Sequence, residues 1–101
     1  MASRLDLHNM LCDILGSANV YFQPPASLAL KYPCIIYERD NPSVMYANDS
    51  PYSHRKCYKV TTIDYDPDSP IPDKVAMLPY SKFVASYKAN NLNHDVYELY
   101  H

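Results

Sequence analysis

The chain contains a single glycine, Gly16, which directly follows its most clearly amphipathic segment. Residues 4–15 place apolar side chains at helical spacing on one face, namely Leu7, Met10, Leu11, Ile14 and Leu15. A helix commonly ends at a residue in the left-handed conformation, which glycine adopts without steric cost. We therefore predict a helix over residues 4–15 that Ser3 caps and that Gly16 terminates.

The scarcity of glycine also argues against several kinds of active site. Phosphate-binding loops need glycines to bring the backbone close to the ligand, and a nucleophile elbow needs them on both sides of its serine. The formal net charge of −2 gives no electrostatic reason to expect nucleic-acid binding, which requires a basic face. The sequence therefore predicts a protein that is not an enzyme and needs no cofactor.

The remaining elements follow from alternation, β-branched residues and turn signals. Strands are expected over residues 20–23, 33–38, 54–64, 82–88 and 92–100, with a short helix over residues 72–78. In the fourth strand, Phe83, Ala85 and Tyr87 are expected on one side. This pattern predicts an α+β fold in one domain over residues 1–101, with a mainly antiparallel sheet and both helices packed on one face.

The acidic turn before the second helix has two possible interpretations. Asp64, Asp66 and Asp68 alternate like the start of a calcium loop. An EF-hand loop would need glycine at its sixth position and glutamate at its twelfth, where this chain has Ser69 and Val75. We therefore expect the carboxylates to cap the free N–H groups of the following helix, with a weak cation site as the alternative.

The cysteines and histidines lack the spacing of a metal site. Cys12, Cys34 and Cys57 are far apart and form no CxxC pair, so we expect buried, reduced thiols. His54, His94 and His101 could serve as zinc ligands together with Cys57. No pair of them, however, has the spacing of a zinc motif. We predict no metal site.

Two stretches outside the regular elements are candidates for binding a partner. The connection over residues 39–53 is long for a small domain, and such connections are usually functional. The chain also has 11 tyrosines, which suit strands and contact surfaces equally. The candidate interface residues are Tyr46, Asn48, Tyr52 and Arg55 from the long connection, with Pro24, Pro25 and Leu28 from an earlier loop for the opposite side of the joint.

The N-terminal residues lack the long apolar run of a signal peptide, and the chain has no apolar stretch of 18 residues. We expect no membrane contact, and synthesis in a reducing cytoplasm.

Several extended motifs together resemble the small tail-completion proteins of long-tailed bacteriophages. The resemblance runs from about residue 11 to the end and rests on residues 20–25, 31–37, 46–48, 51–53, 58–68, 71–74 and 91–97. None of these motifs is catalytic. The family resemblance implies an α+β fold with flanking helices, in agreement with the pattern above.

The resemblance also implies a function and a location. Such a protein would form a homo-oligomeric ring, most often a hexamer, on the head-proximal end of the tail tube. Its partners would be the tail tube protein and a head connector or head-closure protein, with DNA only in transit through the lumen. It would be assembled in the host bacterial cytoplasm and remain in the virion. Two alternatives stay open: a head-closure or adaptor ring of the phage neck, and a small monomeric protein-binding module.

Overall fold

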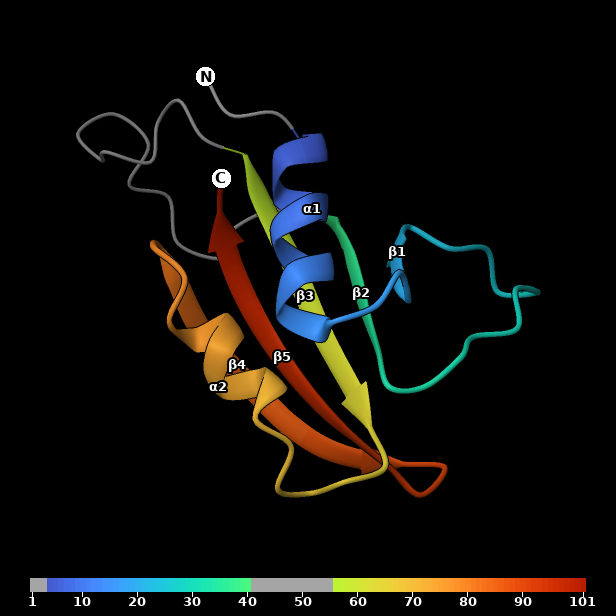
Figure 1. The fold of residues 1–101 in the computed structure, drawn as a ribbon. Coiled ribbons are helices and arrows are strands. Elements are labelled where there is room, and N and C mark those ends of the chain that lie inside the picture. Colours follow the sequence, from blue (N-terminus) through green and yellow to red (C-terminus); the bar gives the residue numbers. More distant parts are fainter. Residues whose placement is uncertain (1–3, 41–55) are drawn as a thin grey trace.

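The computed structural model describes residues 4–40 and 56–101. The elements follow in the order α1 (Arg4–Leu15), β1 (Val20–Phe22), β2 (Cys34–Arg39), β3 (Cys57–Asp64), α2 (Ile71–Ala76), β4 (Ser81–Ala89) and β5 (Leu92–Tyr100). The strands form one sheet with the spatial order β1-β2-β3-β5-β4 (Figure 1). Only β1 and β2 run parallel; the other three pairings are antiparallel. The predicted α+β fold with a mainly antiparallel sheet is confirmed.

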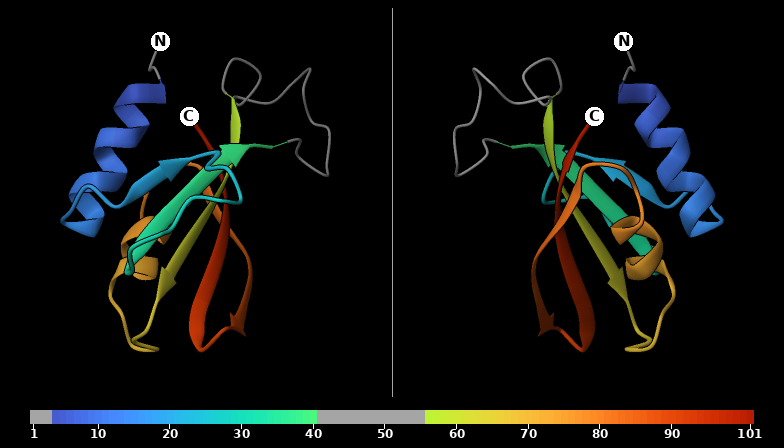
Figure 2. Two further views of the ribbon diagram at one scale, coloured as in Figure 1. Left: turned by 90° about the vertical axis from the view of Figure 1, so that its right-hand side faces the viewer. Right: turned by 90° about the vertical axis from the view of Figure 1, so that its left-hand side faces the viewer.

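Both helices cover the same face of the sheet, as predicted (Figure 2). The longer helix α1 contacts β1 and β2, while α2 contacts β4 and β5 and also touches α1. This arrangement leaves β1 and β4 as the two edges of the sheet, on opposite sides of the domain. Neither described helix has the length and apolar character that a membrane crossing requires.

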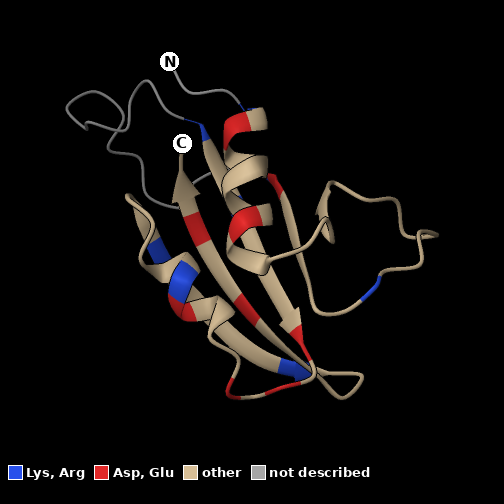
Figure 3. Cartoon of the chain, viewed as in Figure 1, with Lys and Arg blue, Asp and Glu red and all other residues tan. Residues whose placement is uncertain are grey.

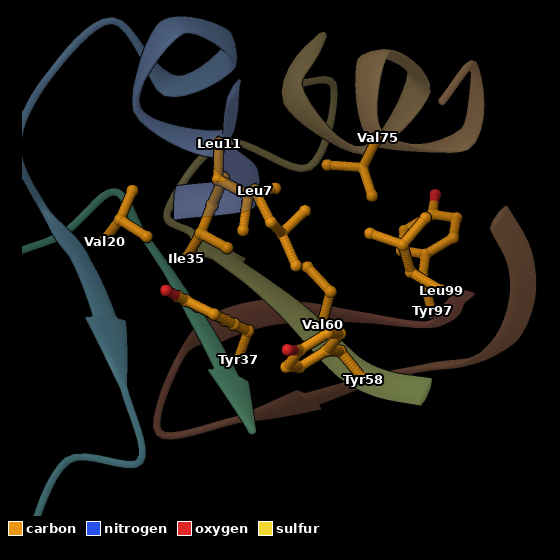
Figure 4. Packing of buried hydrophobic residues seen from close by; sticks show 10 residues of the cluster. All are labelled: Leu7, Leu11, Val20, Ile35, Tyr37, Tyr58, Val60, Val75, Tyr97 and Leu99. Atoms are coloured by element: carbon orange, nitrogen blue, oxygen red, sulfur yellow. The ribbon is translucent and has the colours of Figure 1, made fainter. Parts of the chain in front are cut away.

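The core lies between the helices and the covered face of the sheet (Figure 4). Its buried members are Leu7, Leu11, Val20, Ile35, Tyr37, Tyr58, Val60, Val75, Tyr97 and Leu99. They come from both helices and from every strand except β4. The edge strand β4 therefore contributes little to the core, and most of its side chains remain exposed.

A smaller apolar cluster lies on the other face of the sheet. Cys34, Ile63 and Leu92 are buried there, and the loop before β2 packs Leu30 and Tyr32 against them. The first half of β2 is therefore covered on both faces, since Cys34 and its neighbour Ile35 are both buried.

Two chain reversals use residues with positive φ, and the first is the predicted end of α1. Gly16 has a φ of +79° and its N–H donates to the Cys12 carbonyl at 2.8 Å, which ends α1. Asn90 and Asn91, with φ of 53° and 63°, connect β4 to β5. Asparagine tolerates positive φ better than other non-glycine residues, and two such residues suit a tight hairpin.

Two local predictions are wrong. The helix α2 has Pro70 at its N-cap without a side-chain capping bond. The Asp64 and Asp66 carboxylates instead accept from the N–H groups of Asp66 and Asp68, inside the turn itself. These short side chains reach the amide two residues on before they can reach the helix.

The second error concerns the faces of β4. Phe83 pairs with Tyr97, but the next paired residue is Ala85 with Val96, so Val84 is an extra residue in a β-bulge. A bulge shifts the side-chain alternation by one residue. Phe83 therefore lies on the helix-covered side with Tyr97, while Ala85 and Tyr87 lie on the other side.

Replacement of Gly16 tests the end of α1. A Cβ at this position would meet no atom within 4 Å, so any cost must come from the backbone conformation alone. We expect Gly16→Val to lower the free energy of unfolding by about 1–2 kcal/mol. Gly16→Asn should cost clearly less, because asparagine tolerates positive φ. Urea denaturation of both variants measures the difference, and equal losses would contradict this explanation.

Candidate interaction surface

The exposed large apolar side chains gather on one segment of the chain. Five of the eight described ones lie between the end of α2 and the second half of β4: Met77, Tyr80, Phe83, Val84 and Tyr87. We call these five residues the β4 surface. Met77 is 84% exposed, and Phe83 and Val84 are each 54% exposed. A cluster of exposed apolar residues on a small domain is typical of a contact surface.

The local structure explains why these side chains face solvent. Because β4 is an edge strand, no further strand within the described residues covers its outer side. The Phe83 ring contacts the Tyr97 ring, with the centroids 5.6 Å apart. Tyr87 stacks on His94 on the opposite face of the sheet, with the ring centroids 4.7 Å apart. About half of each side chain nevertheless remains exposed, 54% for Phe83 and 52% for Tyr87.

Three lysines lie on α2 and β4 beside this surface, but acidic residues lie nearby as well, namely Asp73 on α2 and Asp95 and Glu98 on the paired strand β5 (Figure 3). Residues 74–91 contain three lysines and no Asp or Glu. Lys82 and Lys88 lie near the two ends of β4, and both are exposed. Lysines at the ends of an edge strand, together with a bulge in its middle, discourage the indiscriminate addition of further strands. The β4 surface therefore offers side-chain contact more readily than a long ladder of backbone hydrogen bonds.

The loop predicted as the other side of the joint lies at the opposite edge of the sheet. Pro24 is half-buried and Pro25 is exposed, while Leu28 is 43% exposed. The loop is held by a hydrogen bond from the Leu28 N–H to the Pro25 carbonyl at 3.0 Å. The other predicted interface residues, Tyr46, Asn48, Tyr52 and Arg55, lie outside the described residues.

Among the histidines considered for a metal site, His94 lies far from Cys57, whereas His101 exchanges two backbone hydrogen bonds with Lys56, the residue before Cys57. Within residues 4–40 and 56–101, the group of side chains close enough to hold a metal ion includes no histidine. His94 pairs with Ile63, whereas Cys57 pairs with Tyr100 six residues further along β5. At the rise of a strand, these positions are separated by about 20 Å. His54 lies outside the described residues.

The structure instead places Cys57 beside two carboxylates, a contact that the sequence analysis missed. The side-chain ligand atoms of Asp40, Cys57 and Glu98 all lie within 4.8 Å of one another. The Tyr100 hydroxyl hydrogen-bonds Cys57 and Glu98. Burial, followed by the nearby Glu98 and Asp40 charges, raises the pKa of Cys57 to about 11. The thiol is thus protonated at neutral pH, which makes it a poor nucleophile.

The charges around Glu98 follow the strand register. A row of alternating charge crosses four strands on the face away from the helices, formed by Glu38, Lys59, Glu98 and Lys82. Opposite charges on directly paired residues each stabilise a sheet by roughly 0.2–1 kcal/mol. This row explains the side chains without invoking a ligand, and it makes this part of the sheet polar.

No family model, curated protein or solved structure matches the chain.

The buried thiols predict a loss of stability at high pH. Burial also raises the pKa of Cys34 to about 11, with the Asp64 charge as a smaller cause. Since an ordinary thiol titrates near 9.0, the unfolded chain loses these protons first as the pH rises. We expect the free energy of unfolding to fall between pH 9 and pH 11. Chemical denaturation across this range measures it; Cys34→Ala should show a shallower decline, and an unchanged slope would contradict the assignment.

The exposure of Val84 gives a second prediction. We expect Val84→Asp to change the free energy of unfolding by no more than about 0.5 kcal/mol, because the side chain is mostly exposed. The same change should reduce self-association if the β4 surface is a contact surface. Leu5→Asp is the matched control, because Leu5 is 62% exposed but lies on α1. Sedimentation velocity over a range of concentrations compares the three proteins; equal association of both variants would contradict the assignment.

Proposed function

We propose that this chain is a structural subunit of a bacteriophage tail, which forms a homo-oligomeric ring at the head-proximal end of the tail tube. The ring would stop polymerisation of the tube and join the tail to the head connector or head-closure protein. The β4 surface is the observation that carries the proposal. A monomer would keep five large apolar side chains exposed to water, three on the edge strand β4 and two in the segment that leads to it, whereas neighbouring subunits in a ring would cover them.

The motif resemblance supports the choice of a tail-completion protein over other ring-forming proteins. Its motifs include residues 20–25 and 31–37, which contain β1, the two ends of the following loop and most of β2, and residues 91–97, which form most of β5. Of these elements, β1 and β2 lie at the edge of the sheet opposite to β4, and β5 is the strand that pairs with β4. The motifs do not include residues 77–87 of the β4 surface or residues 26–30 of the opposite loop, so the resemblance supports the family and not a particular contact between subunits.

The mild negative charge is compatible with such a ring. The formal net charge is −2, so the protein as a whole does not attract phosphates. DNA that passes through a lumen has to move freely, and a strongly basic wall would hold it. This function needs no cofactor, because it consists of binding to other subunits, to the tail tube and to the head connector or head-closure protein.

Imaging with tail tubes tests the function. Tubes from the phage that encodes the chain would be mixed with the purified protein and examined by negative-stain electron microscopy. We expect density at one end of each tube and no growth of capped tubes when tube protein is added. Leu5→Asp should behave like the wild type, whereas Val84→Asp should cap fewer tubes.

Two other results would redirect the proposal. Binding to isolated heads but not to tubes would assign the chain to the neck as a head-closure or adaptor ring. A protein that stays monomeric and binds neither structure would contradict a role in tail completion and favour a separate binding module.

A further inference from the structure

A hydrogen-bonded group of three side chains connects α1 to the sheet. The Tyr37 side chain on β2 is fully buried, and its hydroxyl oxygen lies 2.7 Å from His8 Nδ1 and 3.1 Å from Arg4 Nη1. Arg4 and His8 are one turn apart on α1, so both reach the same atom. Within residues 4–40 and 56–101, they are the hydrogen-bond partners of this hydroxyl. We call Arg4, His8 and Tyr37 the α1 anchor.

The proton on the Tyr37 hydroxyl determines which form of His8 fits the α1 anchor. A guanidinium group only donates hydrogen bonds, so Arg4 occupies a lone pair of the oxygen and cannot accept from the hydroxyl. Burial raises the pKa of Tyr37, so the hydroxyl keeps its proton at neutral pH. A neutral imidazole with its proton on Nε2 accepts the hydroxyl hydrogen bond at Nδ1, whereas both ring nitrogens of an imidazolium are donors. The anchor is therefore complete only while His8 is neutral.

The positive charges around His8 also disfavour its protonated form. Arg4 precedes it by four residues and donates to the same oxygen, so an imidazolium would put a second positive charge beside the guanidinium. Arg39 adds a further positive charge on β2, two residues after Tyr37 and thus on the same face of the sheet. Because like charges four residues apart destabilise a helix, α1 in its place on the sheet favours neutral His8.

The other groups near the anchor do not offset these charges. Cys12 and Tyr58 approach the buried hydroxyl with a thiol and a phenol rather than a carboxylate. Asp6 is two positions from the histidine on α1, where side chains do not face each other, and Glu38 lies on the opposite face of the sheet. The helix α2, which carries Asp73, packs against β4 and β5, on the far side of α1 from β1 (Figure 1). None of these acidic side chains is placed to stabilise a protonated histidine in the anchor.

We propose that protonation of His8 loosens α1 from the sheet, which makes the α1 anchor a pH-sensitive contact. The inference is independent of the proposed ring. A protonated His8 either turns away and leaves the hydroxyl without an acceptor, or stays and crowds Arg4. A histidine ordinarily titrates at about pH 6.5. Because the folded state favours the neutral ring, the stability that the anchor contributes is present above this range and is lost as the pH falls through it. Since α1 covers β1 and β2, its loosening would expose this part of the core.

Hydrogen exchange in the full chain tests the anchor. Amides of α1 would be compared at about pH 7.5 and about pH 5.5, on either side of the ordinary histidine range, after correction for intrinsic exchange rates. We expect their protection in the wild type to fall at least about fivefold at the lower pH, because a buried hydroxyl loses a partner. His8→Asn puts an amide oxygen that does not titrate near the position of Nδ1, so its protection should differ little between the two pH values. Asp95, whose pKa is raised by burial, titrates in both proteins, so the difference between them isolates His8. His94→Asn is the matched control and should behave like the wild type, since His94 lies on the face of the sheet away from α1.

The outcomes are distinct. Unchanged protection of α1 in the wild type, or equal pH dependence in the wild type and His8→Asn, would overturn the proposal. His8→Lys should show low protection at both pH values, because its positive charge is present throughout this range. Circular dichroism checks that the variants fold, and nitrogen NMR of the wild-type imidazole provides a test that needs no variant. We expect His8 Nδ1 to carry no proton at neutral pH; a proton on Nδ1 in that spectrum means that the anchor is wrong.

Discussion

The position of α1 on the sheet depends on one buried tyrosine. The Tyr37 side chain is fully buried, and its hydroxyl lies 2.7 Å from His8 Nδ1. Arg4 Nη1 donates to the same hydroxyl at 3.1 Å. Both partners are on α1, one turn apart, so a strand in the middle of the chain fixes the orientation of the N-terminal helix. A buried hydroxyl without partners would cost roughly 1–3 kcal/mol, which makes this placement of α1 strongly preferred.

The same tyrosine also organises the edge of the sheet. Its ring contacts Phe22 of β1 at a centroid distance of 4.9 Å and Tyr58 of β3 at 6.0 Å. The Arg4 guanidinium lies 4.3 Å above the Phe22 ring, so α1 also holds β1 directly. A strand of only three residues has few backbone hydrogen bonds of its own, and these contacts keep it beside β2. The loop that follows β1 is positioned as a consequence.

The sequence predicted what depends on local spacing. The span of α1 follows from its apolar stripe and Gly16, and the β4–β5 hairpin follows from alternation around Asn90 and Asn91. It missed the features that depend on pairing register. The Val84 bulge appears only when β4 is aligned with β5, and the contact of Cys57 with Glu98 exists only because Cys57 pairs with Tyr100. The β4 surface was missed for the same reason: nothing local to residues 77–87 shows that β4 ends the sheet.

In the proposed ring, each single edge contact is expected to be weak. The β4 surface is small, and its lysines and bulge limit backbone pairing, so one joint alone should be modest in affinity. In a closed ring, however, the last subunit forms two joints at once, and the second forms at a high effective concentration. A circular partner that holds several subunits side by side would favour closure further by the same effect. Subunits whose edges associate weakly in solution can therefore still form a closed ring on a partner that holds them side by side.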